Sequence, residues 1–269
     1  MPLIALASVK SSPGVTTTAL ALASMWKTAE RRLLLEADPG GGDLGLWLGL
    51  PADSGLAGLA AAARHGHEAG LAWRHARELA GGTHLVAAPT GAEQAAACVA
   101  ALSAAGLPQE LAAADEPVLV DCGRLYPGSP ALAVAAAAAL TVLVVRPRVS
   151  ELAHLEPRVR GLEQAGLRLV VILAAGDRRP PSEPSYPAEE IAGVLGVPVQ
   201  GPLPADPRAV EQLCRRAGDP GPARRLPLLR EAAAAARALE SALGRPPAAP
   251  DLPDEQDLDQ TEAVAGDRG

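Results

Sequence analysis

The chain has 269 residues, which is long enough for one large α/β domain or two small ones. Hydrophobic residues make up 48% of it but phenylalanine is absent, so alanine, leucine and valine must form the core. The sequence has no apolar run of about 18 residues and no basic, cleavable leader, so we expect no integral membrane segment. Its three cysteines are odd in number and widely spaced, which indicates reduced thiols and a cytoplasmic protein rather than a disulfide framework.

Negative charge is concentrated at the C-terminal end of the sequence. The formal net charge is −7, and residues 250–269 alone carry −6. We therefore expect a single domain over residues 1–245, followed by a disordered acidic tail over residues 246–269. Such a tail would repel DNA and anionic lipid rather than bind them.

The first element is an apolar run beginning at Leu3, which predicts a buried strand. A loop of mainly small residues follows, and then a helix rich in alanine and leucine. This order is typical of a phosphate-binding loop, in which backbone N–H groups and the positive end of a helix face an anion. The loop and helix start comprise Lys10, Ser11, Ser12, Pro13, Gly14, Val15, Thr16 and Thr17, and those from Ser11 onward are the candidate phosphate-binding residues.

The segment Lys10 to Thr16, Lys-Ser-Ser-Pro-Gly-Val-Thr, resembles the deviant Walker A loop of the ParA/MinD family of P-loop ATPases, Lys-Gly-Gly-x-Gly-Lys-Thr. The resemblance puts Lys10 on the family's signature lysine, Gly14 on its last glycine and Thr16 on its magnesium-binding threonine. Val15 stands where the family has its catalytic lysine.

A second apolar run, over residues 33–35, predicts a strand that delivers Glu36 and Asp38 into a glycine-rich loop. Taken alone, Asp38 suits a turn after a strand. The resemblance implies more: Asp38 would lie beside the γ-phosphate and the attacking water, as a catalytic and metal-binding residue, with Glu36 as the first acid of the family's Asp-x-Asp. A dinucleotide site would also have an acid about 20 residues further on, but its Gly-x-Gly-x-x-Gly is missing.

Residues 51–82 form a less regular insert for which we expect two short helices, at 56–64 and 70–79. Histidines gather near this insert without supporting acids or thiols, so we interpret them as solvated surface residues rather than metal ligands. They are His65, His67, His75 and His84.

A later apolar run, from Pro117 to Val120, predicts a strand that ends in Asp121 and is followed by Gly123. This resembles the Walker B strand and its switch glycine. On that resemblance Asp121 positions the magnesium ion through water, and the N–H of Gly123 approaches the γ-phosphate.

Further strands are expected at 83–88, at 141–145, at 168–174 and from Val197 onward, with helices at 92–105, 150–164, 188–195, 207–216 and 222–243. Relatives commonly end the strand at 168–174 in an asparagine that recognises adenine, and this chain has Ala174 and Ala175 there. Pro204 and Asp206 resemble the family's nucleotide-base loop. The alternative interpretation of Asp206 is a plain helix start before Pro207.

Apolar strands alternating with helices predict an α/β fold, a doubly wound and mostly parallel sheet of about seven or eight strands, similar to the P-loop NTPases. In such a sheet the ligand binds at the carboxyl ends of the strands. Ser11, Asp38, Asp121 and Pro204 are all predicted at such ends.

The resemblance implies a homodimeric protein that binds ATP with Mg²⁺ and works in cell positioning, such as chromosome partitioning or septum placement, together with an unidentified protein partner. Without a lysine at position 15 we expect weak binding and slow or absent hydrolysis, with Lys10 reaching the phosphates of the other subunit. The alternative is a pseudo-ATPase scaffold that binds no nucleotide. An amide-forming synthetase has no recognisable substrate motif here. Arginine pairs at 31–32, 178–179, 215–216 and 224–225 would suit DNA only if they formed one basic face.

Overall fold

The computed structural model of the chain describes residues 3–10, 12–27, 29–51, 55–66, 70–175 and 186–244. Within these ranges eight strands form one sheet in the order β3-β4-β2-β5-β1-β6-β7-β8. Neighbouring strands run parallel except β3 and β4, which are antiparallel. The predicted α/β fold with a mostly parallel sheet of seven or eight strands is confirmed. The proposed acidic tail at 246–269 lies outside the described residues.

The strands are β1 (Leu3–Ser8), β2 (Arg32–Glu36), β3 (Arg77–Glu78), β4 (Thr83–Val86), β5 (Val118–Arg124), β6 (Leu140–Val145), β7 (Leu169–Ala174) and β8 (Val199–Leu203). The α-helices are α1 (Val15–Met25), α2 (Leu44–Trp47), α3 (Leu56–Ala63), α4 (Leu71–Arg74), α5 (Ala92–Ala104), α6 (Leu107–Ala112), α7 (Leu132–Ala137), α8 (Val149–Gln164), α9 (Ala188–Leu195), α10 (Pro207–Arg215) and α11 (Pro227–Leu243). Two 3₁₀ turns, η1 (Ala80–Gly82) and η2 (Gly221–Arg225), complete the elements.

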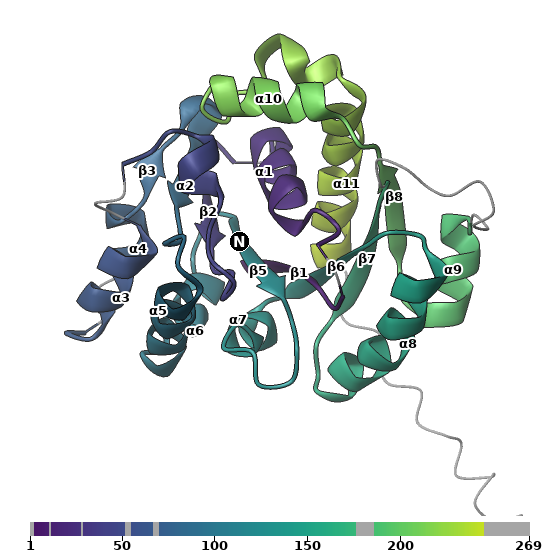
Figure 1. Ribbon diagram of the computed structural model, residues 1–269, viewed down its shortest axis with the longest axis horizontal. Helices are drawn as coiled ribbons and strands as arrows, with labels where there is room; N and C mark the ends of the chain where they lie inside the picture. Colours follow the sequence, from purple (N-terminus) through teal and green to yellow (C-terminus); the bar gives the residue numbers. More distant parts are fainter. Residues whose placement is uncertain are drawn as a thin grey trace, which may run out of the picture.

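Helices cover both faces of the sheet (Figure 1). In β1, Leu3 and Ala5 pack into the core formed with α3 to α9, whereas Ile4 and Leu6 pack into the core formed with α1, α2, α10 and α11. Every residue of β1 is therefore buried. Because both faces are covered, the central strands are continuous apolar runs instead of alternating polar and apolar residues.

Two of the expected helices are shorter than predicted by several residues. The predicted helix at 70–79 ends after α4, because Arg77 and Glu78 pair with β4 as the antiparallel edge strand β3. The last helix begins at Pro227 rather than at 222, since Leu226 is extended (φ −65°, ψ 147°), as a residue before proline prefers.

Candidate functional site

The loop after β1 leads directly into the first turn of α1. Gly14 precedes the helix with a φ of 102°, and a hydrogen bond from Thr18 N to Gly14 O (2.9 Å) closes the turn. Among the described residues no side chain caps this helix end, so N–H groups of its first turn are available to an anion. A cavity of about 260 Å³ lies here, which we call the acid-side cavity. At the loop it is lined by Ser8, Ser12, Gly14, Val15, Thr16 and Thr17.

Val15, the first residue of α1, is 6% exposed. Its side chain packs in the core between α1 and the sheet, and it also borders the acid-side cavity. The position that carries a lysine in a P-loop is therefore apolar here and contributes to packing rather than to charge.

Two candidate acids meet at Gly123, near the end of β5. A methyl group on Gly123 would lie 2.0 Å from Asp38 Cγ, so the Asp38 carboxyl group packs directly against the glycine. Gly123 also has a φ of 57°, which favours glycine. Its N–H donates to Asp121 Oδ1 at 3.0 Å. The structure thus brings Asp38, Asp121 and Gly123 together at the carboxyl edge of the sheet.

Asp121 is fully buried, and its Oδ2 accepts no hydrogen bond from any described residue. The pKa of Asp121 is raised to about 7, mainly because the group is buried. The nearby Thr16 hydroxyl and the Gly123 N–H lower this pKa, and the charges of Glu36 and Asp38 raise it. Burial also raises the pKa of Asp38. A buried carboxylate oxygen without a partner indicates a place where a cation or a donor completes the site.

Glu36 does not line the acid-side cavity but holds the loop beside it. The side chain is 1% exposed, and its Oε1 accepts hydrogen bonds from Asp43 N (2.7 Å) and Leu44 N (3.0 Å). Its Oε2 accepts a hydrogen bond from Ala88 N (2.9 Å), just beyond β4. A methyl group on Gly42 would lie 2.4 Å from Oε2, so the loop needs glycine where it folds back over the carboxylate. Glu36 therefore fixes residues 37–44.

Four residues that line the acid-side cavity were not identified from the sequence: Ser8, Asp43, Trp47 and Arg124. Asp43 directly precedes α2, and Trp47, at the end of α2, is 36% exposed. The sequence offered a reason to choose Asp43, because this acid directly follows three glycines in the loop after a predicted strand. Arg124 is the last residue of β5 and is exposed.

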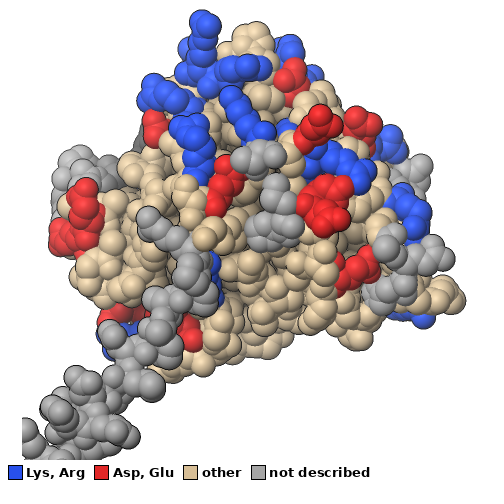
Figure 2. All heavy atoms as spheres, turned by 180° about the vertical axis from the view of Figure 1, so that it is seen from behind, with Lys and Arg blue, Asp and Glu red and all other residues tan. Residues whose placement is uncertain are grey.

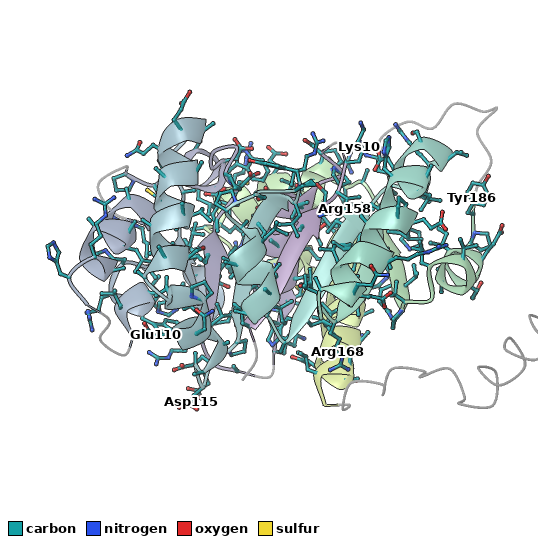
Figure 3. All side chains as sticks on the ribbon, turned by 90° about the horizontal axis from the view of Figure 1, so that it is seen from below. Lys10, Glu110, Asp115, Arg158, Arg168 and Tyr186 are labelled. Atoms are coloured by element: carbon teal, nitrogen blue, oxygen red, sulfur yellow. The ribbon has the colours of Figure 1, made fainter. Side chains whose placement is uncertain are left out.

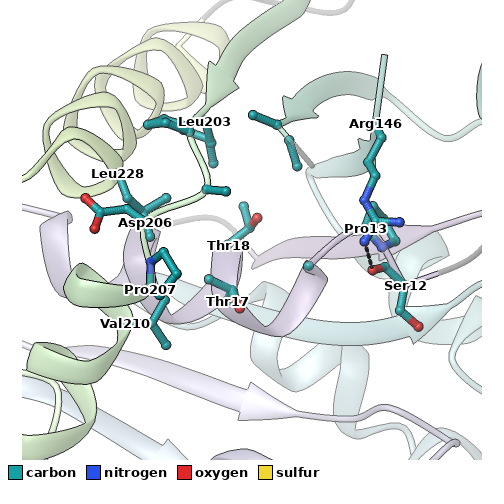
Figure 4. A pocket seen from close by; sticks show the side chains of 15 residues that line it. Ser12, Pro13, Thr17, Thr18, Arg146, Leu203, Asp206, Pro207, Val210 and Leu228 are labelled. Carbon is teal, nitrogen blue, oxygen red and sulfur yellow. Dashed lines mark hydrogen bonds between the residues drawn. The ribbon is translucent and has the colours of Figure 1, made fainter. Parts of the chain in front are cut away.

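A second cavity, of about 210 Å³, lies on the other side of the loop, where the β8–α10 connection approaches α1 (Figure 4). Pro13, Pro204 and Asp206 line this cavity, which we call the proline-side cavity. Asp206 Oδ1 accepts a hydrogen bond from Ala209 N (3.1 Å) and so caps α10, while Oδ2 is buried without a partner among the described residues. One side chain thus both starts the helix and borders the cavity.

Arg146, the residue after β6, also lines the proline-side cavity and was not identified from the sequence. Its Nη2 donates to Ser12 O at 2.7 Å, as Figure 4 shows. The carboxylate of Glu151 accepts from its backbone N at 3.0 Å and pairs with its Nη1 at 3.4 Å. Arg146 is therefore held by α8 and supports the loop. Arg146 could have been identified from the sequence, because it directly follows a buried strand whose carboxyl end lies at the ligand-binding edge of the sheet.

No family model and no curated protein matches the sequence. Solved structures are similar in fold. The cell division ATPase MinD of Pyrococcus furiosus has a TM-score of 0.72 at 19% identity, over 89% of this chain and 98% of its own. The septum site-determining protein MinD of Pyrococcus horikoshii OT3, complexed with Mg-ADP, has a TM-score of 0.70 at 20% identity, over 90% of this chain and 97% of its own. A ParA family ATPase from Chlorobium tepidum TLS has a TM-score of 0.69 at 18% identity, over 88% of this chain and 98% of its own.

The chain has the ParA/MinD fold. The fold predicted from the loop and strand motifs is confirmed. In an open sheet of this kind, ligands bind outside the carboxyl ends of the strands, and both cavities lie there.

In this ParA/MinD fold Lys10 lies at the surface. It is exposed, it makes no hydrogen bond or ion pair with the part of the chain that the structure describes, and Figure 3 shows it at the margin of the molecule. Its position leaves the ammonium group accessible to another molecule. The neighbouring residue Ser11, a candidate phosphate-binding residue, lies outside the described residues.

The arginine pairs differ in their surroundings. Arg32 does not lie on a basic face: it is 5% exposed, and its guanidinium donates to Thr83 Oγ1 (3.1 Å) and to Gly81 O in η1. The pair at 178–179 lies outside the described residues. Lys and Arg side chains gather at the top of the molecule, where α10 lies (Figure 2). Of these, Arg215 and Arg216 pair with acids on or after α10.

The described residues contain no group of three or more His, Cys, Asp and Glu side chains that would hold a metal ion by itself. His84 is not a solvated residue as predicted: it stacks edge-on against Trp73, with ring centroids 5.1 Å apart, because β4 carries it next to α4. His67 lies outside the described residues.

The oxygen donors near Gly123 fit Mg²⁺. Magnesium is usually held by one or two carboxylates together with a nucleotide's phosphates and water, rather than by a cage of protein ligands. Thr16, Asp38 and Asp121 supply such oxygens, and the unpartnered Oδ2 of Asp121 is the observation that supports the fit. Among the described helices none is long and apolar enough to cross a membrane.

Proposed function

We propose that this chain is a nucleotide-binding protein of the ParA/MinD type, which binds ATP with Mg²⁺ weakly and hydrolyses it slowly or not at all. Its role would be in positioning within the cell, as in chromosome partitioning or septum placement, together with a protein partner. Two proteins of similar fold, a cell division ATPase and a septum site-determining protein complexed with Mg-ADP, support this proposal.

The residues of the loop and of the neighbouring strand ends would each bind a different part of the ligand. The N–H groups at the start of α1 would bind phosphate oxygens, and Thr16 and Asp121 would hold Mg²⁺, which neutralises phosphate charge when bound. Asp38 would orient a water molecule at the terminal phosphate. Pro204 and Asp206 would border the base, since they line the proline-side cavity across the loop from the acids.

One observation carries the proposal: Asp121, whose neighbours include Thr16, Asp38 and Gly123, is buried, and its Oδ2 has no hydrogen-bond partner among the described residues. Isothermal titration of the full chain with Mg-ATP tests it, with Asp121→Ala as the defective variant and Asp115→Ala, at an exposed site, as the control. We expect heat of binding for the wild type and the control. Absence of heat for the wild type at saturating nucleotide would contradict the proposal.

A scaffold that binds no nucleotide is the second candidate, and the burial of Val15 favours it. If the chain binds no nucleotide, there is no phosphate charge for a lysine to compensate at this position, and an apolar side chain there stabilises the core. The scaffold predicts that neither the wild type nor a variant with a restored lysine binds Mg-ATP.

A further inference from the structure

The acid-side cavity carries more negative than positive charge. Asp38 and Asp43 line it, Asp121 lies buried next to it, and the residue whose position takes a lysine in a P-loop is Val15. A phosphate chain brings additional negative charge, which backbone N–H groups alone compensate only in part. Arg124 is the only lysine or arginine among the described residues that line this cavity.

An irregularity in β5 decides which side of the sheet Arg124 occupies. Leu6 pairs with Asp121 and Ser8 pairs with Arg124, so three steps along β5 match two steps along β1. The extra residue lies at or next to Gly123, which has a φ of 57°. A bulge of this kind re-aims the side chain that follows it. Leu6 belongs to the core beneath α1, so Asp121 and Arg124 both come to lie on the α1 side.

Arg124 is also the cation that remains available. It is exposed, and it makes no hydrogen bond or ion pair with its side chain within the described ranges. Its backbone is nonetheless held, since it pairs with Ser8 and the next residue donates from Leu125 N to Ser8 O at 2.8 Å. Arg146, by contrast, is already engaged with Ser12 and Glu151.

We propose that Arg124 binds the phosphate chain of the ligand and supplies, from the end of β5, the positive charge that Val15 does not supply from the loop. This inference rests on the proposed function as far as the ligand is a nucleotide. The phosphate-binding role itself applies to any polyphosphate. The planar guanidinium suits phosphate oxygens because it donates two parallel hydrogen bonds.

The test uses the full chain with two probes, Mg-ATP and inorganic triphosphate with Mg²⁺, measured by isothermal titration. Arg124→Gln removes the charge, Arg124→Lys keeps it, and Arg237→Gln on α11 removes an exposed arginine elsewhere. We expect Arg124→Gln to lower the affinity for both probes by about 10- to 100-fold. Arg124→Lys should recover part of this affinity, and the control should change it by at most about twofold. Thermal melting of each variant establishes that it is folded.

The outcomes separate the two proposals. If the wild type binds triphosphate but not Mg-ATP, the proposed function fails, and the triphosphate series still decides the role of Arg124. If Arg124→Gln binds both probes within about twofold of the wild type, the role of Arg124 is wrong. If the wild type binds neither probe, both proposals fall. A weaker dependence of affinity on salt in Arg124→Gln would support direct phosphate contact, which a purely structural role would leave unchanged.

Discussion

Val15 is the residue that separates this chain from an ordinary P-loop. Its side chain borders the acid-side cavity although it is mostly buried, so a longer side chain at this position has a route to the ligand. We expect Val15→Lys to raise the affinity for Mg-ATP roughly tenfold or more, because it adds a charge at the phosphates. The same change should lower the free energy of unfolding by about 1–3 kcal/mol, since it removes a buried apolar group.

Titration calorimetry and phosphate release measure the first effect of Val15→Lys, and chemical denaturation measures the second. Val15→Met, which keeps an apolar side chain of similar reach to lysine, is the matched control. A folded Val15→Lys variant without any gain in affinity would favour the scaffold over the nucleotide-binding protein.

Asp121 should make the ligand-free protein less stable as pH rises. Its folded-state pKa is about 7 and its ordinary value is 3.8, so between these values the folded state holds a proton that the unfolded state releases. The free energy of unfolding therefore falls as pH increases through this window, by roughly 2–4 kcal/mol from this group. Burial raises the pKa values of Glu36 and Asp38 in the same direction.

The pH effect is measured by urea denaturation of the metal-free protein at several values between about pH 4 and pH 8. Asp121→Asn should flatten the decline, whereas Asp115→Asn, at an exposed site, should leave it unchanged. Parallel pH profiles for the wild type and Asp121→Asn would show that Asp121 does not control this dependence.

At the scale of elements, the loop over residues 37–44 depends on one buried carboxylate. Glu36 accepts three backbone hydrogen bonds, which join the end of β2 to the start of α2 and to the end of β4. Glu36→Ala should lower the free energy of unfolding by about 3 kcal/mol or more, because three buried N–H groups lose their acceptor. Glu36→Gln retains an acceptor oxygen and should cost less.

Urea denaturation measures this loss, with Glu163→Ala on the exposed surface of α8 as the control. Amide hydrogen exchange of Asp43, Leu44 and Ala88 gives a local readout, since their N–H groups bond to the carboxylate. Unchanged exchange at all three amides in Glu36→Ala would show that other contacts hold the loop.

At the scale of the whole molecule, Lys10 is placed for contact between molecules. It is exposed and unpaired among the described residues, although it stands at the start of the loop. We expect Mg-ATP to shift the protein from monomer towards dimer in analytical ultracentrifugation. Lys10→Ala should abolish this shift, because it removes the cation that would reach the partner's phosphates, and Lys27→Ala should preserve it. Dimerisation of Lys10→Ala equal to that of the wild type would contradict this role.

Much of the fold was predictable because each central strand is a short apolar run that ends in a polar or glycine-rich loop. Such runs predict a parallel sheet covered on both faces, and β1, β6 and β7 are accordingly buried along their whole length. The antiparallel strand β3 was missed, since Arg77 and Glu78 carry no strand signal of their own and pair only because β4 lies alongside. The pairing of an edge strand depends on which strand the folded chain places beside it, and local sequence does not encode this.

The sequence by itself determined the order of the motifs, and with it the carboxyl edge at which Asp38, Asp121 and Pro204 would gather. Only the tertiary structure decided which acid faces the cavity and which supports the loop, because Glu36 and Asp38 differ in their contacts rather than in their chemistry. It also decided the position of Arg124. A bulge adds one residue to the register between two strands, and that register exists only once β1 and β5 are paired.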